Sequence, residues 1–190
     1  MSDPIALPPP RDGSSHTTPS RPERPYRIAL VCLGNICRSP TAHVVLAEHL
    51  RAAGLADRVE VDSFGTGGWH IGERMDRRSA ATLTAAGYDA TQHRAQQLTA
   101  DRRDDFDLVL AMDRDNLRDL ARLGIPAERM RLFGAFDPAV PGGEVPDPYY
   151  GGPDGFEEVL AMVERTSARL VGLLREGVPT GAEAPLQDRP

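Results

Sequence analysis

The feature that most limits what this chain can fold into is a regular alternation of two kinds of segment between residues 26 and 176. Four short apolar runs are predicted to be strands: 27–32, 59–63, 108–112 and 130–133. Each is followed by a segment with apolar residues at helical spacing: 40–53, 77–86, 114–123 and 156–174. Short continuous apolar runs are typical of parallel strands buried on both faces. The alternation predicts one α/β domain, with a four-stranded parallel sheet flanked by helices on both faces.

The junction between the first strand and the first helix is the most informative part of this pattern. Ser39 is expected to cap the helix and Pro40 to occupy its first position, because these residue types favour those places. Gly54 is expected to end the helix. In flavodoxin-like parallel sheets, ligands bind beyond the carboxyl ends of the strands. Residues 32–39 lie at such an end, so we expect the site there.

The two ends of the chain have a different composition. Residues 1–25 contain 7 of the 17 prolines, separated mainly by polar residues. Such a segment buries too little apolar surface to offset its ordering entropy, so it is predicted to be a disordered tail. A proline-rich docking segment is the alternative. Residues 177–190 are predicted to be a second, flexible tail, which leaves 26–176 as the folded domain.

Composition excludes several classes of protein. The net charge is -6, without the basic balance typical of a nucleic-acid binder. All 22 cationic side chains are arginine, which excludes a Walker lysine and Schiff-base chemistry. Two cysteines are too few for a disulfide-rich scaffold or a four-cysteine zinc site. No apolar run is long enough to span a membrane, and no signal peptide is recognisable. We therefore expect a cytoplasmic protein, with export by a route without a signal peptide left open.

Residues 32–39 read Cys-Leu-Gly-Asn-Ile-Cys-Arg-Ser. A helix N-terminus offers free backbone N–H groups to an anion, and Gly34 and Asn35 tolerate the left-handed conformations that turn such groups inward. Arg38 supplies a planar fork for two phosphate oxygens. The same donors would favour a thiolate at Cys32, which is a good nucleophile for phosphorus. The alternative is a small buried cysteine at the end of a strand, with Arg38 solvated.

The segment 31–40 resembles the signature of the low-molecular-weight protein tyrosine phosphatases, a family that places this loop directly after its first strand. Further similarities extend over about 26–176. They include Trp69, the stretch 93–96, Met112-Asp113 before a helix, and the Asp-Pro-Tyr-Tyr-Gly segment at 147–151. The long N-terminal tail departs from the family pattern, and the resemblance implies nothing about it.

The resemblance implies roles for residues outside the loop. Asp147 would be the general acid that protonates the leaving phenolate and the base that then activates water; on sequence alone, Asp-Pro here is also explained as a turn. Asn35, Ser63 and His93 would brace the loop by hydrogen bonds. The remaining residues expected to bind substrate are Leu33, Gly34, Asn35, Ile36, Cys37, Ser39, Trp69, Tyr149 and Tyr150.

Two polar residues keep two interpretations each. Ser39 can donate to the Cys32 sulfur as well as cap the helix. Asp113 matches a position near the site of the family, but an Asp followed three residues later by Asn116 is also explained by helix capping, the reading that we favour.

These residues predict a protein tyrosine phosphatase that hydrolyses phosphotyrosine through a cysteinyl phosphate, with no metal or cofactor. The expected partner is a phosphotyrosine protein, with no nucleic acid or membrane, and the enzyme is expected to be a monomer or weak dimer. A thiol-dependent arsenate reductase is one alternative, although that chemistry needs cysteines outside the loop. An inactive phosphotyrosine-binding module is the other.

Cys32 and Cys37 are the only cysteines and belong to one loop. A reactive thiolate is prone to oxidation to the sulfenic acid. We expect Cys37 to capture that species as a disulfide; the alternative is that Cys37 packs as a small apolar residue.

Overall fold

The computed structural model describes residues 6–11, 24–140 and 142–177. Four parallel strands form one sheet in the order β2-β1-β3-β4. Their bounds are Tyr26–Cys32 for β1, Val59–Gly65 for β2, Leu108–Ala111 for β3 and Met130–Leu132 for β4. The helices are α1 at Arg38–Ala52, α2 at Arg77–Ala85, α3 at Arg114–Arg122 and α4 at Pro153–Gly177. The predicted α/β class and parallel sheet are confirmed.

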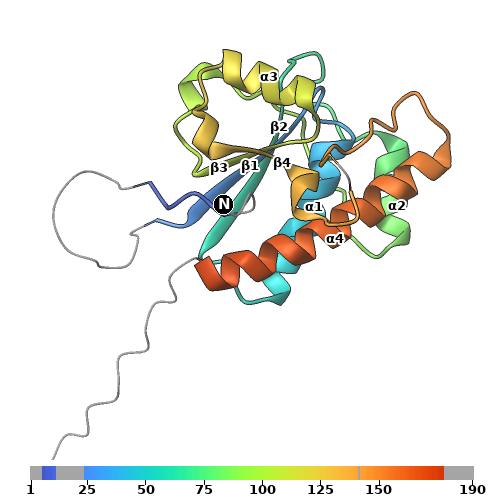
Figure 1. Cartoon of the computed structure of the whole chain (residues 1–190). Helices are drawn as coiled ribbons and strands as arrows, with labels where there is room; N and C mark the ends of the chain where they lie inside the picture. Colours follow the sequence, from blue (N-terminus) through green and yellow to red (C-terminus); the bar gives the residue numbers. More distant parts are fainter. Residues whose placement is uncertain (1–5, 12–23, 141, 178–190) are drawn as a thin grey trace, which may run out of the picture.

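The helices cover both faces of the sheet (Figure 1): α3 lies on one side, and α1, α2 and α4 lie on the other. Short 3-10 turns at Ala100–Arg102, Ala127–Arg129 and Phe133–Phe136 lie in the connections. No helix in the described part of the chain is both long enough and apolar enough to cross a membrane.

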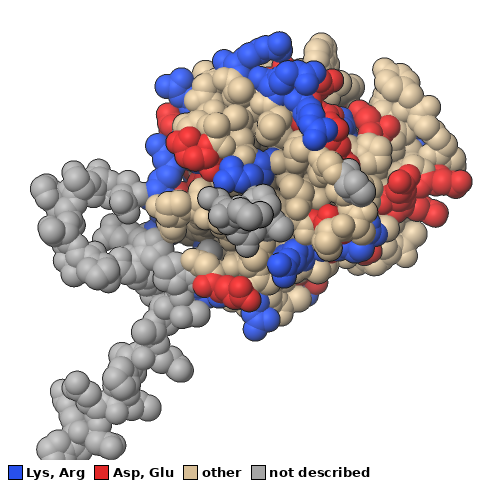
Figure 2. Space-filling model, viewed as in Figure 1, with Lys and Arg blue, Asp and Glu red and all other residues tan. Residues whose placement is uncertain are grey.

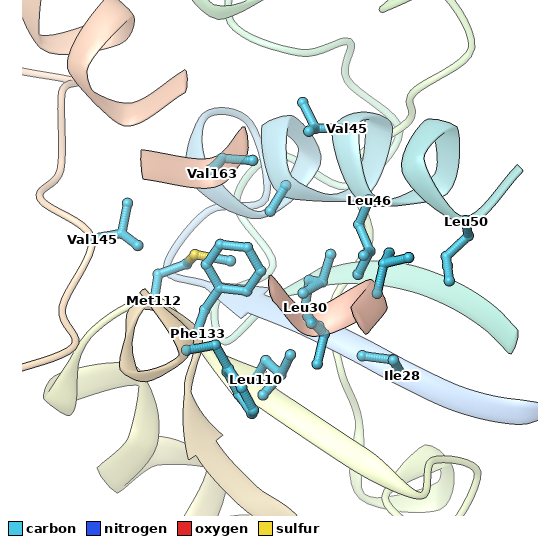
Figure 3. Packing of buried hydrophobic residues seen from close by; sticks show 14 of the residues in the cluster. Ile28, Leu30, Val45, Leu46, Leu50, Leu110, Met112, Phe133, Val145 and Val163 are labelled. Atoms are coloured by element: carbon cyan, nitrogen blue, oxygen red, sulfur yellow. The ribbon is translucent and has the colours of Figure 1, made fainter. Parts of the chain in front are cut away.

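The central strand β1 explains the continuous apolar run in the sequence. Ile28, Leu30 and Cys32 face the layer of α1 and α4, whereas Ala29 and Val31 face the layer of α3. Both sets are buried, so no position in this part of the strand favours a polar residue. Figure 3 shows Leu30 packed near residues such as Leu46 of α1 and Phe133.

After β1 the chain continues to β2, which pairs with one edge of β1. The next strand, β3, pairs with the opposite edge of β1. This arrangement creates a switch point between the carboxyl ends of β1 and β3, where parallel sheets bind ligands. The loop at 32–38 follows β1, and Asp113 follows β3. The topology therefore brings these two segments to the same edge of the sheet.

The N-terminal segment differs in part from the disordered tail expected for 1–25. Leu7 packs against the larger core cluster, and the Tyr26 hydroxyl donates to the Pro8 carbonyl over 2.9 Å. The Arg11 amide donates to Asp107 over 2.8 Å. Composition suggested disorder, but residues 6–11 use a buried hydroxyl and a buried carboxylate as anchors. The predictions for residues 1–5, 12–23 and 178–190 concern residues outside the described ranges. Gly177, expected to begin the C-terminal tail, is the last residue of α4.

Candidate active site

The loop between β1 and α1 turns sharply at Asn35. This residue has a φ of 54°, the one positive value for a non-glycine residue among the described ranges. The turn directs the Asn35 amide at the Cys32 sulfur, with 3.3 Å between N and Sγ. Of the two residues that tolerate left-handed conformations, Asn35 adopts one and Gly34 does not. A Cβ at Gly34 would lie 3.1 Å from the His70 ring, a close contact that a small shift of His70 would have to relieve.

The Cys32 sulfur has a second polar neighbour, the Ser39 hydroxyl, at 3.0 Å. This hydroxyl also lies 3.1 Å from the Phe64 carbonyl, and it accepts a hydrogen bond from the side-chain Nδ2 of Asn35 over 2.9 Å. Because the hydroxyl has one proton, it can donate to the sulfur or to the carbonyl, but not to both at the same time. The prediction that Ser39 caps the helix is wrong: α1 begins at Arg38, its cap position is Cys37, and no side chain caps it.

Arg38 is buried at the mouth of this loop and bridges two carboxylates. Its NH1 donates to Asp113 Oδ2 over 2.6 Å and to the Val145 carbonyl over 3.2 Å. Its NH2 donates to Asp147 Oδ2 over 2.9 Å. Burial alone would lower the pKa of Arg38, but the Cys32 sulfur and the two carboxylates outweigh it and raise the pKa. The guanidinium therefore stays charged, and its two ends are held by Asp113 and Asp147 at the border of the cavity.

Asp113 does two jobs at once. Its Oδ1 accepts from the Asn116 amide over 2.7 Å and caps α3, as the sequence pattern predicts. Its Oδ2 holds Arg38. Sequence reasoning favoured the cap over a place at the site, and the structure shows contacts of both kinds. The spacing to Asn116 was visible in the sequence, whereas the contact with Arg38 joins residues 75 positions apart.

Asp147 lies on the loop before α4, with its side chain 40% exposed. Its Oδ2 contacts Arg38, and its Oδ1 accepts from the Tyr149 amide over 3.1 Å. The structure therefore brings Asp147 to the mouth of the Cys32 loop, and it also shows the Asp-Pro turn that the sequence alone suggested.

A second layer of polar groups supports the loop from behind. Ser63 Oγ accepts from the Asn35 side-chain amide over 3.1 Å, and His93 Nε2 lies 2.8 Å from the Asn35 carbonyl. The backbone amide of Gln96 donates to the side-chain oxygen of Asn35 over 2.8 Å. Burial lowers the pKa of His93, so near pH 7 its neutral ring donates from Nε2 to the carbonyl. The Asn35 and Ser39 side chains thus lie behind the loop and do not line the cavity.

The cavity in front of the loop has a volume of about 320 Å³. Its walls include Trp69, Tyr149 and Tyr150, which are 71%, 39% and 94% exposed. The remaining lining residues are Cys32, Leu33, Gly34, Ile36, Cys37, Arg38, His70 and Asp147. Sequence reasoning missed His70, and it offers no local signal for it. The Trp69 ring lies across Gly67, where a Cβ would overlap it.

A larger cavity of about 690 Å³ lies behind the same loop, between α1, the end of β2 and residues 87–96. It is lined by His43, Asp62 and His93 among others, and no cysteine faces it. Size alone would select this cavity. The chemistry selects the smaller one, because the sulfur and Arg38 border it.

The two cysteines differ in their surroundings. Burial raises the pKa of Cys37 to about 12, although a hydrogen bond with Ser79 opposes the shift. Cys37 therefore stays a thiol near pH 7. Cys32 has the Asn35 amide, Ser39 and Arg38 around it, and this environment suits a nucleophile.

Comparison with known proteins agrees with this geometry. The family model described as low molecular weight phosphotyrosine protein phosphatase matches residues 27–180. The chain belongs to this family. A low molecular weight protein-tyrosine-phosphatase of Streptomyces coelicolor is 50% identical over 159 residues, covering 80% of this chain and 96% of that protein. Low molecular weight protein-tyrosine phosphatase A of Mycobacterium bovis is 46% identical over 142 residues, covering 74% and 86%.

The solved structures agree with the sequence comparisons. A protein tyrosine phosphatase from Entamoeba histolytica, solved with Hepes in its active site, matches with a TM-score of 0.75 at 32% identity. The match covers 80% of this chain and 98% of that one. As a member of the low molecular weight phosphotyrosine protein phosphatases, the chain is a hydrolase that acts on phosphotyrosine, as predicted. This assignment is favoured over an arsenate reductase or an inactive binding module.

Proposed function

We propose that this enzyme hydrolyses phosphotyrosine in proteins in two steps, with Cys32 as nucleophile, Arg38 as phosphate ligand and Asp147 as acid and base. The observation that carries the assignment is the convergence of three groups on one cavity. The Cys32 sulfur lies at its base with the Asn35 amide and the Ser39 hydroxyl, and Arg38 and Asp147 pair at its mouth.

The first step forms a bond between the sulfur and phosphorus and breaks the bond from phosphorus to the tyrosine oxygen. The loop amides and Arg38 hold the other phosphoryl oxygens. Arg38 keeps its NH1 on Asp113, so NH2 is the end that can exchange Asp147 for a phosphate oxygen. Asp147, which is 40% exposed, takes up a proton from solvent once it is released from Arg38. It then turns to the leaving oxygen and transfers that proton to it.

The second step hydrolyses the thiophosphate. Asp147, now a carboxylate, takes a proton from water as the water attacks phosphorus. The sulfur leaves as a thiolate, and the Ser39 hydroxyl at 3.0 Å donates to it. The products are inorganic phosphate and the free enzyme, in which Cys32 is again a thiolate and Asp147 carries the proton from water. The two steps need no cofactor.

The walls of the cavity favour an aromatic ester. Trp69 and Tyr149 line it above the loop, and flat rings pack well against a phenyl group. An alkyl phosphate such as phosphoserine is shorter and would place less apolar surface against these rings.

We also propose a cytoplasmic location, because Cys32 must stay reduced to act and Cys37 is a free thiol as well. The expected oligomeric state is a monomer or weak dimer. We propose no nucleic-acid partner, since the net charge is -6 and the face in Figure 2 carries charges of both signs.

The test is turnover of p-nitrophenyl phosphate and a phosphotyrosine peptide by the wild type, Cys32→Ser and Arg38→Lys. Cys32→Ser should have no measurable turnover. Arg38→Lys should be severely impaired, because one ammonium cannot reproduce a planar fork that holds Asp113 with NH1 while NH2 binds a phosphate oxygen. Arsenate with dithiothreitol is assayed in parallel. Near-normal turnover in either variant, or arsenate reduction without phosphatase activity, would refute the assignment.

A further inference from the structure

Arg78 lies on the first turn of α2, outside the cavity lining, yet it reaches the loop that carries Asp147. Its NH1 donates to the Tyr149 carbonyl over 3.0 Å. Its guanidinium also lies over two rings: the Cζ atom is 5.4 Å from the Tyr149 centroid and 4.6 Å from the Phe156 centroid. One side chain thus contacts both the loop and the helix that follows it.

Arg78 is in turn held by Asp76, the cap of α2. Its Nε and NH2 donate to the two Asp76 oxygens, over 3.1 Å each. The Asp76 amide donates to the Ile36 carbonyl in the Cys32 loop over 2.8 Å. A continuous set of contacts therefore runs from the Cys32 loop through Asp76 and Arg78 to Tyr149.

Asp147 lies between two fixed points. On one side, the Val145 amide donates to the Met112 carbonyl over 2.7 Å, and the Val145 carbonyl accepts from Arg38. On the other side, Tyr149 is held by Arg78, and its amide donates to Asp147 over 3.1 Å. Only the first of these anchors comes from the sheet edge.

We propose that Arg78 is a positioning residue that sets the place of Asp147 relative to the Cys32 loop. This inference rests on the proposed role of Asp147 as general acid. The ion pair with Asp76 alone would contribute little at a side chain that is 44% exposed. The combination of a planar fork and two ring faces is specific to arginine, so a lysine cannot reproduce it.

The test measures kcat/KM for aryl phosphates with leaving groups from 2,4-dinitrophenol to phenol. Arg78→Met should lose about 10- to 100-fold on phenyl phosphate, because small misplacements of a catalytic group have effects of that order. It should lose less than about threefold on 2,4-dinitrophenyl phosphate, whose leaving group needs little protonation. Arg77→Met, the exposed neighbour on the same helix, is the matched control and should match the wild type.

A double-mutant cycle with Asp147→Asn separates positioning from a general structural effect. If Arg78 acts through Asp147, Arg78→Met should cause no further leaving-group-dependent loss in the Asp147→Asn background. An undiminished loss in that background, an equal loss on all esters, or a phenyl phosphate rate equal to that of Arg77→Met would overturn the proposal.

Two further measurements complete the design. The kcat/KM of Arg78→Lys on phenyl phosphate should lie between those of Arg78→Met and the wild type. This variant also keeps the proposal testable if circular dichroism shows that Arg78→Met does not fold. Asp147→Asn alone must show a leaving-group-dependent loss. If it does not, Asp147 is not the acid, and the positioning role falls with it; if it does and neither Arg78 variant shows one, only the positioning role is wrong.

Discussion

Cys32 and Cys37 lie five positions apart in one loop, yet their surroundings give them different chemistry. Cys32 has hydrogen-bond donors and a guanidinium around its sulfur. Cys37 is buried beside Ser79, and its pKa is raised to about 12. At the residue scale, reactivity therefore follows from the local donors, since both side chains are almost equally buried.

Oxidation tests this contrast. Peroxide should inactivate the enzyme by converting Cys32 to a sulfenic acid, and dithiothreitol should restore activity if Cys37 has captured that species. Phosphate in the cavity should slow the loss. Cys37→Ser should lose activity irreversibly under the same dose. Full recovery of that variant, or the lack of a Cys32–Cys37 link by mass spectrometry in the oxidised wild type, would show that Cys37 only packs.

Asp113→Asn separates the two jobs of Asp113. An asparagine still accepts from the Asn116 amide, and it caps helices about as well as aspartate. It cannot give Arg38 a charged partner, so we expect kcat/KM to fall by about tenfold or more. A fall of this size corresponds to the loss of one hydrogen bond to a charged group. Arg38 keeps Asp147 as a second charged partner, so the free energy of unfolding should fall by only about 1–2 kcal/mol, less than for a buried guanidinium that loses its whole ion pair. A large loss of stability with normal kcat/KM would mean that Asp113 is a cap alone.

At the scale of elements, the helices and strands were largely predictable from the sequence, because their signals are local. The run at 27–32 is apolar throughout because both faces of β1 are buried. Gly54 and Gly124 follow α1 and α3 with positive φ values of 69° and 90°. The error at Ser39 has a physical reason: its hydroxyl is used by the sulfur and by Asn35 and does not cap the helix.

The site was only partly predictable, because its remaining contacts join distant residues. Cys32 and Arg38 share one short loop, which a sequence pattern can reveal. The reach of Arg78 to Tyr149 spans 71 positions, and that of Arg38 to Asp147 spans 109. His70 lines the cavity beside Gly34. No local pattern encodes such contacts.

The helix α1 and the segment 87–96 enclose two histidines behind the loop, which gives stability a dependence on pH. Burial lowers the pKa of both His43 and His93 below the ordinary value of 6.5. Their neutral forms are therefore favoured in the folded state, and the unfolded chain binds protons first as pH falls. Their contribution to stability is complete above about pH 6.5 and is lost as pH falls below it, toward their folded pKa values.

Urea unfolding at pH 7 and pH 5 measures this effect. The free energy of unfolding should be lower at pH 5, and the difference should shrink in His43→Gln, which removes one of the two partly buried rings. An unchanged difference in this variant would show that His43 does not contribute, and that other groups set the pH dependence.

At the scale of the whole molecule, Asp107 joins the N-terminal segment to the sheet. Its buried carboxylate accepts from the Arg24 guanidinium over 2.6 and 2.9 Å, and from the amides of Arg11 and Arg27 over 2.8 Å each. Asp107 precedes β3 at the end of the sheet opposite the cavity. The anchor thus stabilises the domain without touching the site.

Asp107→Asn should lower the free energy of unfolding by about 3 kcal/mol. It removes the charge of a buried carboxylate that pairs with Arg24, and it turns an NH2 group toward donors that the carboxylate now accepts from. kcat for p-nitrophenyl phosphate should stay within about twofold, since no group at the cavity changes. Urea unfolding and steady-state kinetics check the two parts. A large fall in kcat in the folded variant would show that this end of the sheet is coupled to the site.

The central claim is that catalysis passes through a phosphate bound covalently to Cys32. The most direct measurement is acid quenching of the enzyme during turnover of p-nitrophenyl phosphate, followed by mass spectrometry of its peptides. We predict one phosphoryl group on the peptide that contains Cys32, at a higher level in Asp147→Asn if loss of the base slows hydrolysis more than formation, and none in Cys32→Ser. A phosphoryl group on another residue, or Cys32→Ser turning over substrate at the wild-type rate, would contradict the account.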